Sequence, residues 1–367
     1  MALEIMTPDW GKTPFPEENN SFHPSDWKDG IIVRTPNWLG DFVMCVPALI
    51  QLRKLLPPEC ALELIAPKAF RPIVEALRPL TGESFFLADS HAFPTRKEME
   101  KIKSFHPGAG VLFNNSFRDA LWMRFCGFAP LFGAKARNRS FLLKKEITFP
   151  KRLDRVLNTP HQAAKYLAVA GLLGVKEEWD GSLPELNLLR EWEVYSDDVR
   201  KALEEENLLA IAPGAMYGDA KKWPPEYYRS VAWNWIRERK GRVVLLSAGN
   251  EVLSAREAIQ DLPADKVIDL AGKTDLSQLM QILKQAKFCI ANDSGTMHLS
   301  ALVGGAGLSV FGSTDPAATS PISKKWRILY DKEECSPCFC RVCPEGTKKC
   351  LTKVTPEMVI SCMKDLC

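Results

Sequence analysis

Short apolar runs alternate with longer stretches whose apolar positions have helical spacing. In the first half of the chain each run predicts a strand and each longer stretch a helix. The predicted strands are residues 31–33, 61–65, 84–88 and 110–113, and the predicted helices are 42–56, 70–77, 95–105, 117–126 and 161–173. Strands that alternate with helices are typical of parallel sheets with helical crossovers.

The same alternation starts again after a predicted linker at 177–187. The second series predicts strands at 208–212, 242–247, 266–270, 288–291 and 308–311, with helices at 225–239, 251–260, 276–286 and 297–303. No repeat of fixed period relates the two series. The pattern therefore predicts an α/β protein with two Rossmann-like halves that face one cleft.

Length and composition agree with this organisation. A chain of 367 residues is longer than the 250–300 or so that one core usually supports, and 46% hydrophobic with 25% charged residues is ordinary for a soluble protein. The net charge of +3 does not argue for a nucleic-acid partner. No apolar run approaches the roughly 20 residues that cross a bilayer, and the polar, proline-containing first 30 residues lack the apolar core of a signal peptide. We expect no transmembrane segment and a cytoplasmic location.

Two common nucleotide motifs are missing. The chain has neither G-x-G-x-x-G between a strand and a helix nor G-x-x-x-x-G-K-[ST]. The glycine-rich run 304–307 precedes a predicted strand and is better explained as a turn. Hydride transfer and P-loop phosphotransfer are therefore disfavoured.

Asp41 lies where the first predicted strand gives way to a helix, in the turn Pro-Asn-Trp-Leu-Gly-Asp. Ligands of open α/β sheets bind beyond the carboxyl ends of the strands, so Asp41 is a candidate general base. The alternative is that its carboxylate caps the helix and interacts with the helix dipole. The spacing alone favours capping.

The loop after the predicted strand 208–212 has residues suited to a phosphate. Gly214 and Gly218 allow close backbone approach, and Lys221 and Lys222 offer positive charge. A solvated lysine pair is the structural alternative.

The loop after the predicted strand 288–291 leads into a helix N-terminus at Gly295, which is a ready anion site. Alternatively, Asp293 and Ser294 are ordinary N-caps and His298 is a packed core histidine. Both loops leave strand ends of one sheet, where they can converge on a diphosphate.

Eleven cysteines include a group near the C-terminus. Without a signal peptide this group does not indicate a secreted disulfide framework. The spacing of Cys335, Cys338, Cys343 and Cys350, with Cys340 between them, permits a structural zinc site, while packing or a stray disulfide remain open alternatives.

Taken together and in order, these segments resemble the ADP-heptose:lipopolysaccharide heptosyltransferases of glycosyltransferase family 9. The segments are 37–41 through Pro47, 114–118, 213–215 with 221–224, 292–295 with His298, and 335–339 with 343–344 and Cys350. The resemblance implies a GT-B fold and an inverting transfer of L-glycero-D-manno-heptose from ADP-heptose to the heptose-I/Kdo inner core of lipopolysaccharide. Alternatives are another GT-B glycosyltransferase, a sugar-nucleotide epimerase, or a non-catalytic nucleotide-sugar-binding protein.

The resemblance also implies roles for individual residues. Asp41 is the expected base, Lys221 stabilises the diphosphate, and Asp293 contacts the donor sugar. The other expected donor contacts are Ser294, Gly295, Thr296, Gly214, Ala215, Lys222 and His298, with Glu251 at the nucleoside; the expected acceptor contacts are Asn37, Trp38, Arg118, Arg137 and Arg139. No Asp-x-Asp pair lies at a strand end, so no cofactor is expected beyond the possible metal at the cysteines.

Domain boundaries follow from the same pattern. We expect a polar extension at 1–29, an acceptor-binding domain at 30–187, a nucleotide-sugar domain at 188–330, and a cysteine-rich segment at 331–367 that packs back toward the N-terminal domain. Eight basic residues between 135 and 155 are either a solvated face or a docking surface for the anionic glycolipid at the inner face of the inner membrane. They are Lys135, Arg137, Arg139, Lys144, Lys145, Lys151, Arg152 and Arg155.

Overall fold

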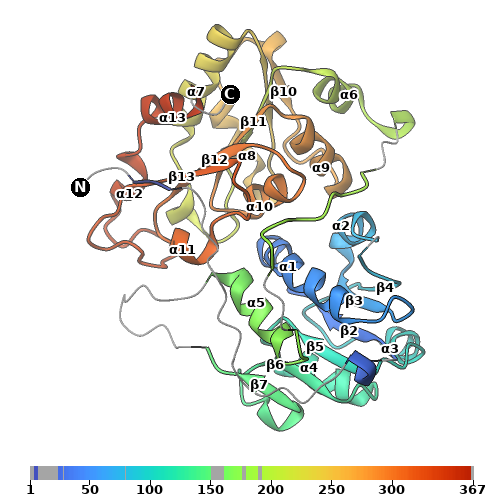
Figure 1. The fold of residues 1–367 in the computed structure, drawn as a ribbon. Coiled ribbons are helices and arrows are strands. Elements are labelled where there is room, and N and C mark those ends of the chain that lie inside the picture. The colour runs from blue at the N-terminus through green and yellow to red at the C-terminus, as the bar shows by residue number, and fades with distance from the viewer. Residues whose placement is uncertain are drawn as a thin grey trace. The chain divides into compact units, whose positions relative to one another are not determined.

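The computed structural model describes residues 4–6, 24–27, 29–78, 80–149, 161–175, 179–188 and 192–364. The chain forms two compact units, each with its own sheet (Figure 1). Unit 1 comprises Met1–Asp9 and Leu188–Cys367, and unit 2 comprises Trp10–Asn187.

Unit 2 contains a six-stranded parallel sheet. Its order is β4-β3-β2-β5-β6-β7, so the chain starts in the middle, builds outward to one edge, and then returns to build the other half. The strands are β2 (Ile31–Arg34), β3 (Leu62–Pro67), β4 (Ser84–Leu87), β5 (Ala109–Leu112), β6 (Leu131–Ala134) and β7 (Lys145–Ile147). The topological switch point therefore lies between β2 and β5.

Helices cover the sheet of unit 2 with apolar side chains. They are α1 (Leu39–Leu55), α2 (Arg71–Ala76), α3 (Arg96–Lys103), α4 (Phe117–Phe125) and α5 (Gln162–Gly171). Three begin with side-chain caps: Thr95 and Glu98 form a capping box at α3, Ser116 accepts from the Asp119 amide at α4, and His161 accepts from the Ala163 amide at α5. One core cluster packs α3 and α4 against the strands around Ile32 and Leu112.

Unit 1 contains a seven-stranded sheet with the order β1-β13-β12-β11-β8-β9-β10. Every pairing is parallel except that of β1 with β13, at the edge. The strands are β1 (Glu4–Met6), β8 (Leu208–Ala212), β9 (Arg242–Leu245), β10 (Val267–Asp269), β11 (Phe288–Asn292), β12 (Gly307–Phe311) and β13 (Trp326–Tyr330). The switch point of this sheet lies between β8 and β11.

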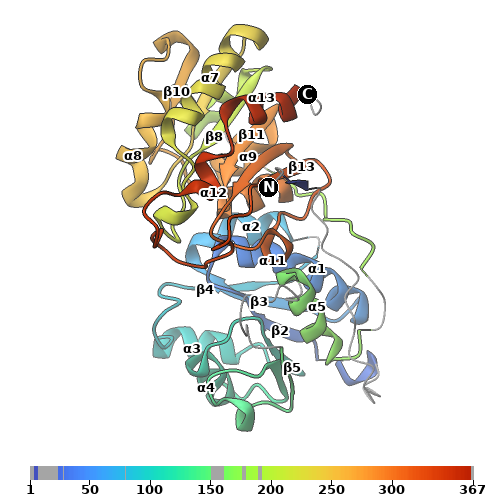
Figure 2. The ribbon, with the colours of Figure 1, turned by 90° about the vertical axis from the view of Figure 1, so that its left-hand side faces the viewer.

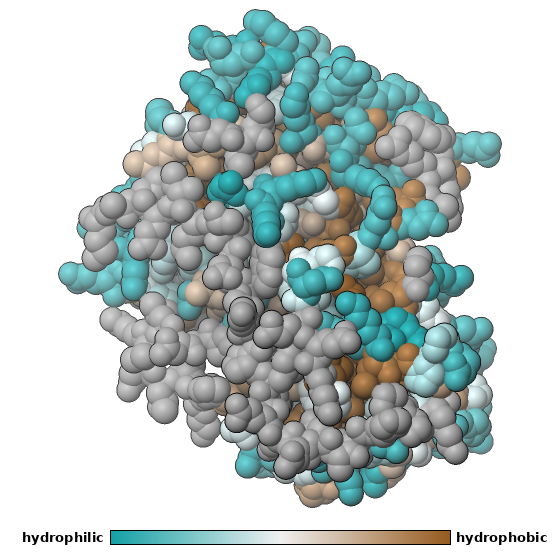
Figure 3. All heavy atoms as spheres, viewed as in Figure 1, coloured by the Kyte–Doolittle hydropathy of each residue, from teal (hydrophilic) through white to brown (hydrophobic). Residues whose placement is uncertain are grey.

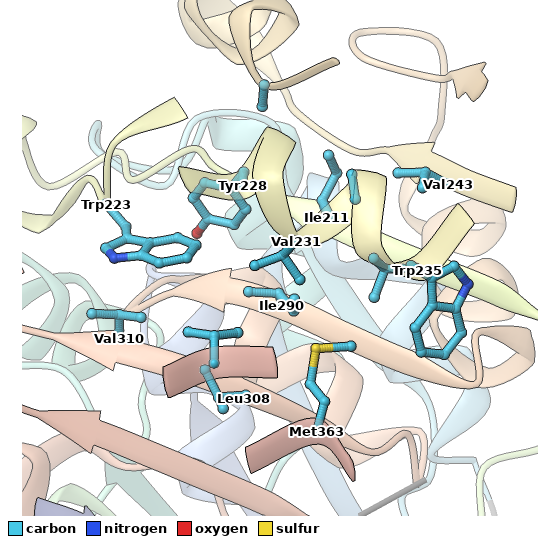
Figure 4. Packing of buried hydrophobic residues seen from close by; sticks show 14 of the residues in the cluster. Ile211, Trp223, Tyr228, Val231, Trp235, Val243, Ile290, Leu308, Val310 and Met363 are labelled. Atoms are coloured by element: carbon cyan, nitrogen blue, oxygen red, sulfur yellow. The ribbon is translucent and has the colours of Figure 1, made fainter. Parts of the chain in front are cut away.

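The helices of unit 1 lie on both faces of the sheet (Figures 1 and 2). They are α6 (Asp197–Glu204), α7 (Pro225–Arg239), α8 (Val252–Arg256), α9 (Leu276–Gln285), α10 (Gly295–Leu302), α11 (Pro316–Thr319), α12 (Lys349–Thr352) and α13 (Pro356–Lys364). On one face, Trp235 of α7 and Met363 of α13 pack with Ile211 and Leu308 of the strands (Figure 4). Over the same unit the outer surface around α7 is mainly hydrophilic, as amphipathic helices require (Figure 3).

Short 3-10 turns complete the regular structure. They are η1 (Pro24–Trp27), η2 (Lys68–Phe70), η3 (Ser140–Leu142), η4 (Trp192–Val194), η5 (Asp219–Lys221), η6 (Gly249–Glu251), η7 (Glu257–Ile259) and η8 (Ala264–Lys266). Within the described ranges, no helix is long and apolar enough to cross a membrane.

The cysteine-rich C-terminal segment completes the core of unit 1. Cys350, Leu351, Val354 and Val359 are buried in the cluster that α7 forms with the strands. The described residues of this segment belong to unit 1, where their apolar side chains pack against α7. The return toward the N-terminal domain stays a prediction.

All the predicted strands and all but one of the predicted helices form, with ends shifted by a few residues. The predicted helix at 251–260 is instead α8 followed by the 3-10 turn η7. The hydrophobic pattern missed β6, β7 and β13 and the edge strand β1.

Glu63 on β3 generates a pH-dependent prediction. Its side chain is half-buried, it has no cationic partner among the described residues, and burial together with the nearby Glu83 raises its pKa to about 8. In the unfolded chain a glutamate ionises near pH 4.3, so wild-type stability falls as the pH rises from about 4.3 to 8 and this contribution is constant above that.

Glu63→Gln is therefore expected to raise the melting temperature by about 2–4 °C at pH 9, corresponding to about 1 kcal/mol after allowance for solvent screening. At pH 4 the two proteins should melt together. The exposed Glu59→Gln is the matched control, and calorimetry at both pH values is the measurement. An equal gain at pH 4 and pH 9 would contradict the assigned pKa.

Candidate functional site

Unit 1 brings the two predicted phosphate loops together at its switch point. The lysine loop, residues 213–224, follows β8, and Asp293 follows the adjacent strand β11. Helical crossovers leave β8 and β11 in opposite directions, so their carboxyl ends lie at a crevice. The sheet topology thus places both loops where open α/β sheets bind ligands.

Lys221 and Asp293 form a largely buried ion pair in this crevice. The Nζ atom of Lys221 lies 2.5 Å from Oδ2 of Asp293, and the Thr314 hydroxyl donates to the same oxygen at 2.5 Å. Asp293 is therefore not the cap of α10. The N-cap is Ser294, whose side chain makes no capping hydrogen bond.

The first turn of α10 keeps the features of an anion site. Ser294, Gly295 and Thr296 are partly exposed, while His298 is only 3% exposed within the helix. The amides at a helix start and the positive end of the helix dipole favour a bound anion. The predicted phosphate contacts are thus accessible, whereas His298 lies in the core behind them.

Glu251 holds the lysine loop from the side. It is 9% exposed; its Oε1 lies 2.8 Å from Lys222 Nζ and accepts a hydrogen bond from the Ala215 amide at 3.1 Å. A Cβ on Gly214 would lie 2.7 Å from Oε2 of Glu251, so a larger residue there would displace the Glu251 carboxylate. Glu251 therefore compensates the charge of Lys222. The alternative from the sequence, that Lys221 and Lys222 are simply solvated, does not describe Lys222.

The sequence reasoning missed the role of Asn292. Its side chain is fully buried and its Nδ2 donates to the Pro213 carbonyl at 2.6 Å. Its Oδ1 accepts from the Trp223 amide at 3.0 Å and from the Tyr228 hydroxyl at 2.9 Å. The sequence signal for this role is an asparagine at the end of an otherwise apolar strand. Asparagine is depleted in strands, so its presence there indicates a specific partner.

In unit 2 the Asp41 turn also lies at a switch point, since it follows β2 next to β5. The N-cap of α1 is Trp38, so Asp41 is the third helical residue and not the cap. The Tyr166 hydroxyl on α5 donates to Oδ1 of Asp41 at 3.1 Å, and burial together with the Asp41 charge raises the pKa of Tyr166. A buried phenol that stays protonated thus orients the carboxylate.

Two predicted acceptor residues, Asn37 and Arg118, join a buried network around Asp119. Arg34 Nε lies 2.8 Å from Asp119, and Arg34 also donates to Asn37 Oδ1 at 2.7 Å. Arg118 lies 2.9 Å from the other carboxylate oxygen and donates to the Ser90 carbonyl. Burial tends to raise the pKa of Asp119, but Arg34, followed by hydrogen bonds from Arg118 and Asn114, holds it below its usual value.

Arg139 requires a correction, because it is fully buried and is not available to an acceptor. Its guanidinium donates to the carbonyls of Ala134, Asn114 and Ser116 at 2.8–3.2 Å, and burial lowers its pKa to about 10. Arg139 therefore fixes the backbone of the loop after β5 by hydrogen bonds to its carbonyl groups.

The remaining acceptor candidates are on the surface. Arg137 is exposed with φ 46°, and Trp38 is 57% exposed. Lys135 lies 3.7 Å from Glu146. Of the basic run, Lys151, Arg152 and Arg155 lie outside the described residues.

The predicted cysteine quartet lies close together. Burial raises the pKa of Cys350 to about 11, and Cys335, Cys338 and Cys343 also raise it. None of the four forms a disulfide, and within the described ranges no three His, Cys, Asp or Glu side chains are arranged to hold a metal ion. Cys350 Sγ fills the space beside Gly312. A metal, a disulfide or packing alone at the quartet stays a prediction.

Two Rossmann-like units, with a lysine loop and a helix N-terminus at one switch point, have the architecture of the GT-B class. The sequence model of glycosyltransferase family 9 (heptosyltransferase) matches residues 102–349. The chain belongs to this family and is a glycosyltransferase.

Individual relatives are similar in sequence, and solved structures are similar in fold. Lipopolysaccharide heptosyltransferase 2 of Escherichia coli is 26% identical over 349 residues, which cover 90% of this chain and 96% of the relative. The structure of E. coli ADP-heptose heptosyltransferase II is similar with a TM-score of 0.71, 24% identity, and coverage of 92% and 98%. An E. coli heptosyltransferase with ADP-2-deoxy-2-fluoro heptose has a TM-score of 0.61 at 16% identity, with coverage of 91% and 99%.

Asn292→Ala tests the tie between the two loops of unit 1. The change leaves the buried Trp223 amide, Tyr228 hydroxyl and Pro213 carbonyl without their partner, so the free energy of unfolding should fall by about 2–4 kcal/mol. Urea unfolding is the measurement. Asn234→Ala on α7, a partly exposed position, is the control and should change stability little. Equal stability of both variants would show that the hydrogen bonds of Asn292 do not stabilise the two loops.

Proposed function

We propose that this protein transfers L-glycero-D-manno-heptose from ADP-heptose to the heptose-I/Kdo inner core of lipopolysaccharide, with inversion. The observation that carries the proposal is the pairing of Lys221 with Asp293 beside the open first turn of α10. Membership of a family described as heptosyltransferases supports the donor, and the names of the relatives support the acceptor.

On the donor side, unit 1 supplies positive charge for the diphosphate. As the bond between the anomeric carbon and the phosphate oxygen breaks, negative charge grows on the departing ADP. Lys221 and the amides of the α10 N-terminus stabilise that charge. Asp293 holds Lys221 in place before the donor binds and is the proposed contact to the donor sugar.

On the acceptor side, Asp41 is the proposed general base. Its carboxylate takes the proton of the acceptor hydroxyl, the hydroxyl oxygen forms the new bond to the anomeric carbon, and ADP leaves from the opposite side. One base suffices because the single displacement needs no covalent sugar intermediate. Tyr166 fixes one carboxylate oxygen of Asp41 and so limits its rotation.

We further propose that the protein works peripherally at the inner face of the inner membrane. The acceptor is a membrane-borne anionic glycolipid, and Arg137 and Lys144 are exposed cations of unit 2. Cations near an anionic membrane surface contribute about 1 kcal/mol each to binding.

The decisive assay incubates the purified protein with ADP-heptose and a heptose-I-terminated acceptor. The expected result is stoichiometric release of ADP and addition of one heptose to the acceptor, seen by mass spectrometry. Absence of both products, with turnover of a different nucleotide sugar, would overturn the proposed donor and acceptor.

Asp41→Asn is expected to lower kcat by about 10²–10⁴ while leaving the dissociation constant for ADP within about twofold. The amide keeps the shape of the side chain but cannot accept the proton. Asp29→Asn, at an exposed position of unit 2, is the control. A variant at position 41 with wild-type kcat would exclude Asp41 as the base.

Lys221→Ala is expected to lower kcat/KM for ADP-heptose by about 10²–10³, because it removes a charge at the leaving group and leaves Asp293 uncompensated. Steady-state kinetics with the glycolipid acceptor is the measurement. Lys284→Ala, an exposed lysine on α9, should retain wild-type kinetics. Unchanged kinetics at position 221 would refute its role at the phosphates.

A further inference from the structure

The cysteine-rich segment, residues 335–350, lies directly against the lysine loop. The Tyr217 hydroxyl donates to the Phe339 carbonyl at 2.6 Å, and the Ala220 amide donates to the Arg341 carbonyl at 3.0 Å. Asp219 pairs with Lys348 of the same segment. These contacts hold the middle of the loop, residues 217–220, against the segment.

Gly218 shows how closely the lysine loop approaches the cysteine-rich segment. Its φ is 154°, and a Cβ at this position would lie 2.4 Å from the Arg341 carbonyl oxygen, which no side chain tolerates. The fit requires glycine, because any larger residue would push Arg341 away from the loop.

The same fit places two cations on one aromatic ring. Lys221 Nζ lies 4.8 Å from the centroid of Tyr217, and the Arg341 guanidinium carbon lies 5.5 Å from it. Both are within the range of a cation–π interaction. Like charges that share a ring repel each other, so an anion close to both of them is favoured.

The two cations differ in whether an acidic side chain neutralises their charge. Lys221 is paired with Asp293, whereas Arg341 is exposed and has no acidic partner among the described residues. A planar guanidinium can bind phosphate oxygens in a bidentate manner, which a lysine cannot. Arg341 thus has the chemistry and the uncompensated charge to take up a phosphate that approaches Lys221.

We propose that Arg341 is a second cation for the diphosphate of the nucleotide-sugar donor, held over Tyr217 by the cysteine-rich segment. The inference rests on the proposed donor site at Lys221 and extends it to a residue outside the two strand-end loops. The segment then has a role in donor binding, because its backbone presents Arg341 to the lysine loop.

The test compares the binding of ADP and adenosine to the full-length protein, with adenosine measured by competition against ADP. Arg341→Ala is expected to weaken ADP binding about tenfold and to leave adenosine binding unchanged, because adenosine lacks the phosphates. Arg341→Lys should recover part of the loss, since the charge returns without the bidentate geometry. Arg237→Ala, an exposed arginine at the end of α7, is the matched control and should bind both ligands normally.

The outcomes separate this inference from the function on which it rests. If wild-type protein binds ADP and Arg341→Ala binds it equally well, the inference is overturned and the donor site stands. An equal loss of ADP and adenosine affinity would assign Arg341 to loop packing alone and would also overturn it. If wild-type protein binds no ADP, the proposed donor site itself fails, and the inference fails with it.

Kinetics provides an independent readout. Arg341→Ala should raise KM for ADP-heptose more than it lowers kcat, because the contact forms as the donor binds. A variant whose kcat alone falls would contradict a role in donor binding.

Discussion

The buried amide of Asn292 joins the two loops on which the donor site depends. It receives hydrogen bonds from the Trp223 amide and the Tyr228 hydroxyl and donates one to the Pro213 carbonyl, so it links β11 to the lysine loop and to the start of α7. In water these groups would be solvated, but in the core each needs a protein partner. The hydrogen bonds that pair these buried groups also position the loop that carries Lys221 at the switch point.

Charge compensation follows the same logic in both units. Lys221 with Asp293, Lys222 with Glu251, and Arg34 with Asp119 each place a cation and an anion where a single charge would be costly. In unit 1 each lysine is paired with an acid from the loop that follows a different strand. In unit 2 the Arg34–Asp119 pair is fully buried and serves the fold, because it anchors the turns that follow β2 and β5.

Residues that looked equivalent in the sequence have different roles in the structure. Arg137 and Arg139 are two residues apart in one basic run, yet Arg137 is exposed and Arg139 is buried among backbone carbonyls. Lys221 and Lys222 are adjacent, yet their partners come from the loops of different strands. Local sequence cannot separate these cases, because burial and pairing depend on residues far along the chain.

What the sequence by itself determined is the alternation of strands and helices and the position of the polar turns after β2, β8 and β11. Those features follow from the local period of apolar residues and from turn chemistry, which act over a few residues. Tertiary structure alone decided that Tyr166 orients Asp41, that Glu251 braces Gly214 and Lys222, and that Arg341 lies over the ring of Tyr217. These contacts join residues separated by dozens of positions, and only the packing of helices and loops on a sheet brings such residues within hydrogen-bonding distance.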